Sequence, residues 1–134
     1  MTNLALLNLL INAKGSVIIG SKGLGLENCN DIDIAMLDSD YRLLKVSENN
    51  YFEGEMKNYF SVLPMGNNKL VKFDGVDLLL FEHQRNLDAV SEVIELMKQI
   101  PKSILQVKRI RVYIFEQLLI TDHGFKNRDN GWLT

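Results

Sequence analysis

Two carboxylates separated by one residue, Asp31 and Asp33, are the clearest candidates for chemistry in this chain. They open the segment Asp31–Leu37 (DIDIAML), whose initial alternation of polar and apolar residues predicts a half-buried strand. Residues i and i+2 of a strand project from the same face, so we expect the two carboxylates to point together. Adjacent anions repel each other unless a cation lies between them, and the hard ions Mg²⁺ and Mn²⁺ prefer oxygen ligands. The alternative, a polar strand entry without a ligand, stays open.

A third carboxylate, Asp77, is the second residue of the otherwise apolar run Val76–Phe81 (VDLLLF). A charge in such a run is costly to bury unless it is paired or bound to metal, although an edge position facing solvent would also tolerate it. Lys69–Phe73, the turn signal Asp74-Gly75 and this run together predict a hairpin. Three carboxylates on adjacent strands would hold two metal ions about 3.5 to 4 Å apart, the arrangement used for in-line phosphoryl displacement.

The elements that must position these residues follow from hydrophobic periodicity, capping residues and turn signals. We expect helices at 2–13, 47–59, 86–100 and 104–121, strands at 16–20, 31–37, 59–63, 69–73 and 76–81, and a loop or short helix at 21–30. This order predicts an α+β fold, a small mixed sheet with helices packed on one side and two helices at the C-terminal end. We expect one domain over 1–122, with its core at 15–82 and C-terminal helices at 86–121, followed by a tail at 123–134.

A Gly20-Ser21 pair ends the first predicted strand, nine residues intervene before Asp31-x-Asp33, and a lone aspartate lies in a later apolar strand. This combination resembles the signature of the DNA polymerase β superfamily of nucleotidyltransferases. Within that superfamily, GSKGLGLENCNDIDI is similar to a branch with Gly-Leu and a small polar residue before Asp-x-Asp, filled here by Gly25-Leu26 and Asn30. That branch includes predicted nucleotidyltransferases of bacteria and phages, some associated with RNA repair, and the minimal nucleotidyltransferases of toxin–antitoxin systems.

The resemblance implies a role for each matching residue. Gly20 and Ser21 would contact the β and γ phosphates of a nucleoside triphosphate such as ATP. Asp31 and Asp33 would bind two Mg²⁺ or Mn²⁺ ions, and Asp77 would hold the metal under the attacking hydroxyl and help to remove its proton. The implied reaction is attack of an acceptor hydroxyl on the α-phosphorus, with release of pyrophosphate.

Two departures from the family pattern bear on phosphate binding and substrate choice. Many minimal members carry an arginine shortly after Gly-Ser, whereas this chain has Lys22, so the phosphate-neutralising cation is Lys22 or comes from elsewhere. No base-recognition element is identifiable, and the acceptor stays open between RNA, a protein side chain and a small molecule. The basic residues near the last predicted helix form either a solvated face or a contact surface for an RNA or protein acceptor; they are Lys102, Lys108, Arg109 and Arg111.

Several of these residues also allow other interpretations. Ser21 is as well suited to cap a helix as to bind phosphate. His83 and His123 are each expected to be solvated, with His83 the better candidate for the rim of the site. A catalytically weak member acting as an antitoxin-like partner or nucleotide sensor is the alternative function, and a structural domain with a coincidental motif is a third.

Bulk properties narrow the class of protein. The chain has 134 residues, of which 46% are apolar and 24% are charged. Its formal net charge of −2 argues against a protein that coats nucleic acid by bulk electrostatic attraction, but it allows a local basic patch. The single Cys29 leaves no internal disulfide, and no apolar stretch approaches the roughly 20 residues that span a bilayer. We therefore expect a cytoplasmic protein without a membrane partner; its oligomeric state is left open.

Overall fold

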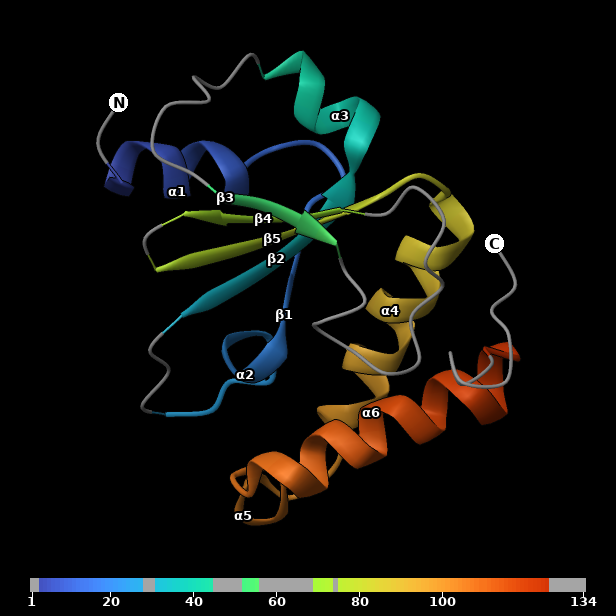
Figure 1. Cartoon of the computed structure of the whole chain (residues 1–134). Coiled ribbons are helices and arrows are strands. Elements are labelled where there is room, and N and C mark those ends of the chain that lie inside the picture. Colours follow the sequence, from blue (N-terminus) through green and yellow to red (C-terminus); the bar gives the residue numbers. More distant parts are fainter. Residues whose placement is uncertain (1–2, 28–30, 45–51, 56–68, 74, 126–134) are drawn as a thin grey trace.

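The computed structural model describes residues 3–27, 31–44, 52–55, 69–73 and 75–125 (Figure 1). Its centre is a five-stranded sheet with the strand order β1-β2-β5-β4-β3. The strands are β1 (Val17–Ile19), β2 (Ile32–Leu37), β3 (Phe52–Glu55), β4 (Lys69–Phe73) and β5 (Val76–Phe81). The central pair β2 and β5 is parallel and every other pair is antiparallel, so the sheet is mixed.

Helices flank this sheet and complete an α+β fold, which confirms the predicted class. They are α1 (Asn3–Ile11), α2 (Gly20–Gly23), α3 (Asp38–Leu43), α4 (Gln84–Met97), α5 (Lys102–Leu105) and α6 (Lys108–His123). No helix within the described ranges combines the length and apolar character that crossing a bilayer requires.

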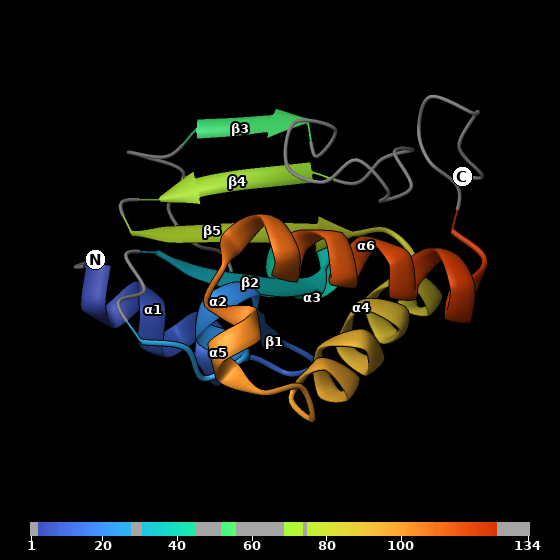
Figure 2. The same cartoon turned by 90° about the horizontal axis from the view of Figure 1, so that it is seen from below.

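The helices lie on both faces of the sheet, whereas the sequence predicted them on one side. The C-terminal helices α4 and α6 do share one face, where their apolar residues pack against Ala35, Leu79 and Phe81. The opposite face is covered by α1 and α3 (Figure 1), because Leu10 and Tyr41 pack against the other alternating set of strand residues. Figure 2 shows the face that α4 and α6 cover. Each face of β2 and β5 is therefore largely buried, as expected for parallel strands between two helical layers.

The helix predicted over 86–100 corresponds to α4, and the helix predicted over 104–121 is divided between α5 and the longer α6. In α4, the buried residues recur at helical spacing, from Leu87 to Met97, and this periodicity is what made the helix predictable. Pro101 ends the connection as expected, but it occupies the N-cap position of the single-turn helix α5, so Ser103 does not cap the last helix. The long helix α6 ends at Gly124, which adopts the left-handed conformation (φ 69°) that favours glycine.

The predicted helix over 47–59 is wrong where the structure describes it. Residues 52–55 form β3, which pairs antiparallel with β4. Gly54 is a poor helix former, and backbone pairing with β4 determines the conformation instead. The rest of that segment, the predicted strand at 59–63, and the tail from residue 126 onward lie outside the described residues.

Candidate functional site

One row of residues crosses the sheet and carries the predicted carboxylates. Asp33 of β2 is the direct register partner of Asp77 of β5, and their outer neighbours in the row are Ile19 of β1 and Lys72 of β4. Directly paired residues of neighbouring strands project to the same face, and neighbouring strands lie about 4.8 Å apart. Asp33 and Asp77 are therefore immediate neighbours on the face that α4 and α6 cover.

The acidic pair lies where the apolar core of that face ends. In the next row along β2 and β5, Ala35 and Leu79 are fully buried, whereas Asp33 and Asp77 are only partly covered. The Asp77 side chain retains 14% of its exposure, and its Oδ1 lies 3.7 Å from the Lys72 Nζ. Because the Lys72 side chain is half exposed, this is a loose, solvated ion pair, and it leaves the carboxylate oxygens accessible to a stronger cation.

Asp31 lies just before β2 and is exposed. The amide of Ile32 donates to the carbonyl of Gly75 at 3.0 Å, which fixes the start of β2 beside the turn that leads into β5. Within the described part of the chain, however, the side chains of His, Cys, Asp and Glu form no group of three that could hold a metal ion. The structure thus brings Asp33 and Asp77 together, and a site that also includes Asp31 stays a prediction.

Gly20 packs directly against the Asp33 carboxylate. Its φ of 65° lies in the left-handed region, and a Cβ at this position would collide with the Asp33 Oδ2. Only glycine satisfies both constraints without strain. The Gly-Ser bend and the first strand aspartate, ten or more residues apart in the sequence, therefore form one structural unit.

Ser21 and Lys22 belong to the single-turn helix α2, which packs against β1 and β2. The N-cap position is Ile19, without a side-chain hydrogen bond, so the interpretation of Ser21 as a helix cap is wrong. Ser21 is half-buried and Lys22 is exposed. Phosphate binding by Gly20, Ser21 and Lys22 stays a prediction.

Lys102 is a cation near this loop that the sequence did not place there. A Cβ on Gly25, which follows α2 and has a φ of 73°, would lie 3.4 Å from the Lys102 Nζ. The ammonium group of α5 thus lies against the loop that continues from Gly20-Ser21. Sequence spacing only assigned Lys102 to the basic residues near the last helix, because nothing local shows which loop α5 docks against.

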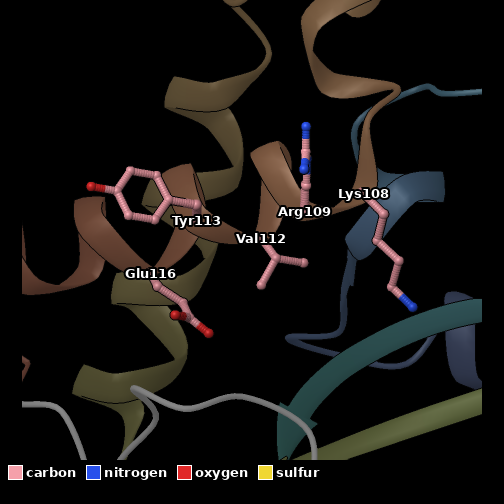
Figure 3. A pocket seen from close by; sticks show the side chains of 5 residues that line it. All are labelled: Lys108, Arg109, Val112, Tyr113 and Glu116. Atoms are coloured by element: carbon pink, nitrogen blue, oxygen red, sulfur yellow. The ribbon is translucent and has the colours of Figure 1, made fainter.

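The structure divides these basic residues into two kinds. Arg111 donates from Nη1 to the carbonyls of Leu105 and Gln106, both at 3.3 Å, and so holds the turn between α5 and α6. Lys108 and Arg109 instead line a shallow groove of about 540 Å³ on α6 (Figure 3). Val112, Tyr113 and Glu116 complete its lining.

Neither histidine lies at the acidic pair. His83 is exposed beyond the far end of β5, whereas Asp77 lies near its start, and its Nε2 is 3.8 Å from a carboxylate oxygen of Glu82. His83 therefore does not reach the rim of the candidate site. The Nε2 of His123 lies 3.5 Å from a carboxylate oxygen of Glu92 and links α6 to α4.

Comparisons of the chain with models of protein families, with curated proteins and with solved structures return no match.

Proposed function

We propose that this protein is a metal-dependent nucleotidyltransferase that moves a nucleoside monophosphate from a nucleoside triphosphate to a hydroxyl acceptor and releases pyrophosphate. The observation that carries the proposal is the register of β2 and β5, which makes Asp33 and Asp77 neighbours beside the Gly20 bend. The register places two partly covered carboxylates side by side at the end of an apolar core, and among the residues that the structure describes only a loose ion pair with Lys72 is recorded for Asp77. They are well suited to bind a cation.

The donor set fits a hard divalent cation, because adjacent carboxylates supply the oxygen ligands that Mg²⁺ and Mn²⁺ prefer. Asp33 and Asp77 would hold the metal, and Asp31, just before β2, would join them in a two-ion centre. When bound, the metal supplies charge neutralisation for the triphosphate and acidifies the attacking hydroxyl.

The remaining residues have roles that their positions support. Without a Cβ, Gly20 lets phosphate oxygens approach the backbone closely, and the Ser21 hydroxyl can donate to them. The exposed ammonium groups of Lys22 and Lys102 flank the same loop and would neutralise the β and γ phosphates. As the acceptor oxygen bonds to the α-phosphorus and the bond to pyrophosphate breaks, the proton passes to the Asp77 carboxylate.

A second candidate is a nucleotide-binding module without transfer activity, such as a sensor or an antitoxin-like partner. The ion pair between Lys72 and Asp77 favours it, because a cation already faces the carboxylate that would take the proton. The lack of a preformed group of three metal-ligating side chains in the described ranges also favours it. This module would bind a triphosphate and leave it intact.

Transfer of label from each α-labelled triphosphate, with Mg²⁺ or Mn²⁺ and with total RNA and cell lysate as acceptors, separates the two candidates. Transferase activity should disappear in Asp33→Asn and Asp77→Asn and persist in Asp88→Asn, an exposed aspartate of α4 that accepts a hydrogen bond from Gln84. Triphosphate binding without any transfer would favour the module. If no triphosphate with metal raised the melting temperature, both candidates would be excluded.

A further inference from the structure

We propose that the groove on α6 binds single-stranded nucleic acid and that this strand is the acceptor. The groove is lined by Lys108, Arg109, Val112, Tyr113 and Glu116 and is hereafter called the α6 groove. The role as acceptor rests on the proposed transferase function, whereas the binding itself does not. Binding of nucleic acid can therefore be tested separately from nucleotide transfer.

The chemistry of the α6 groove is distributed along its length. In Figure 3, Lys108 and Arg109 flank one end, Val112 lies between, and Tyr113 and Glu116 flank the other end. Two cations at one end and an accessible aromatic ring at the other can bind a single nucleic acid strand, the cations through its phosphates and the ring through a stacked base. The shallow shape suits a flexible strand better than a small ligand that must be enclosed.

Three side chains of the α6 groove, Lys108, Arg109 and Tyr113, are exposed. The Tyr113 side chain is 63% exposed, whereas Phe115 and Leu119 of the same helix fill the core. Within the described residues, neither Lys108 nor Arg109 is held in a salt bridge, in contrast to Arg111, which is bound to backbone carbonyls. Both cations and the ring are therefore available to a ligand.

The position of the α6 groove relates it to the acidic pair. Its cationic end is the first turn of α6. The preceding helix, α5, contacts the loop after α2 through Lys102 and Gly25. Figures 1 and 2 both place α2, α5 and the start of α6 at the end of the molecule where β2 and β5 begin. A nucleic acid strand that runs along the α6 groove past Lys108 would therefore lead toward Asp33 and Asp77.

Nucleic acid fits the α6 groove better than a protein acceptor. An acidic peptide would use Lys108 and Arg109 but would supply no base to stack on the exposed Tyr113 ring. A nucleic acid strand uses both ends, because its phosphates are drawn to the cations and its bases to the ring. It also ends in a sugar hydroxyl, the type of acceptor that the proposed reaction needs.

Fluorescence anisotropy with a short labelled RNA, without metal or triphosphate, tests the binding. We expect the wild-type protein to bind it, and Lys108→Ala/Arg109→Ala to lower the slope of log affinity against log salt by about 1.4, since each phosphate contact contributes roughly 0.7 for single strands. Tyr113→Ala should weaken binding by about fivefold or more, whereas Tyr113→Phe should retain it. Lys14→Ala/Arg85→Ala removes two exposed cations elsewhere and is the matched control.

The outcomes separate this inference from the proposed function. Asp33→Asn should bind RNA as the wild type does. If the wild-type protein bound RNA but transferred no label, RNA binding by the α6 groove would be supported and the transferase function would not. The inference would be overturned if the wild type failed to bind RNA, if it bound a duplex as tightly as a single strand, or if the control pair weakened binding as much as the groove pair. If the label were transferred to protein and no RNA were bound, the acceptor would be a protein side chain instead.

Discussion

The two faces of the sheet are built from the same strands and differ in one respect. Under α1 and α3, the alternating residues of β2 and β5 are all apolar, and Ile34, Met36, Leu78 and Leu80 among them are at most 2% exposed. Under α4 and α6, Ala35 and Leu79 are equally buried, but the row before them is Asp33 and Asp77. The chain thus keeps one face wholly apolar and places two acids at one end of the other.

This difference separates stability from function within a single pair of strands. Buried apolar residues on both faces stabilise the fold, at roughly 25 cal/mol per Å² of apolar surface. Two neighbouring carboxylates contribute repulsion instead, as functional sites commonly do. Substitution of a buried apolar residue should therefore lower stability, whereas substitution of either acid should lower activity with little effect on stability.

The largest effect on stability is expected at Leu78→Ala, on the apolar face. Leu78 is completely buried against residues such as Leu10 and Val71, and truncation leaves a cavity that its neighbours fill only in part. We expect the free energy of unfolding to fall by about 2 to 5 kcal/mol in urea denaturation. A loss below about 1 kcal/mol would show that this face is loosely packed.

Gly20→Ala should produce the next largest effect, on the acidic face. The new Cβ would collide with the Asp33 carboxylate, and the positive φ would be strained in any case. We expect a loss of about 1 to 3 kcal/mol in the free energy of unfolding, together with loss of transferase activity. The matched control is Gly75→Ala, which has a similar φ of 78° but no atom within 4 Å of the added Cβ, so it carries the backbone strain alone.

Asp77→Asn should alter stability little and activity greatly. The amide keeps the shape of the side chain and removes the repulsion from Asp33, while it gives up a loose ion pair with Lys72. We expect the free energy of unfolding to stay within about 1 kcal/mol of the wild type. A loss comparable to that of Leu78→Ala would mean that the carboxylate is a structural group and would remove the contrast between the faces.

The smallest effect is expected at Lys72→Ala. The Lys72 side chain is half exposed and its ammonium group lies 3.7 Å from Asp77, so the pair should contribute no more than about 1 kcal/mol to the free energy of unfolding. If the cation competes with the metal, its removal should raise the affinity for Mn²⁺. Weaker Mn²⁺ binding would show instead that Lys72 orients Asp77.

Local patterns were sufficient to predict most of the fold. The alternation in DIDI and the Asp74-Gly75 signal gave β2 and the β4–β5 hairpin, and apolar spacing gave α4 and α6. The segment after β2 was predicted only to end the strand, although Asp38 and Arg42, four residues apart, form an ion pair at 2.9 Å that supports α3. That charge pair was a usable signal.

Other features depend on contacts between distant segments and leave no local trace. β3 forms because β4 offers it a partner edge, which the sequence of residues 52–55 does not reveal. The same holds for Lys102, whose place beside Gly25 follows from the docking of α5. In the candidate site, the types and strands of Asp33 and Asp77 were predictable, but their pairing in register required the strand order.

Titration of Mn²⁺ followed by electron paramagnetic resonance, with a non-hydrolysable triphosphate present, tests most directly whether Asp33 and Asp77 act together as a cation site. We expect the wild-type protein to bind Mn²⁺, Asp33→Asn and Asp77→Asn each to weaken that binding at least about tenfold, the equivalent of roughly 1.4 kcal/mol, and Asp88→Asn to leave it unchanged. Equal Mn²⁺ affinity in all four proteins would contradict a shared metal site on this face of the sheet.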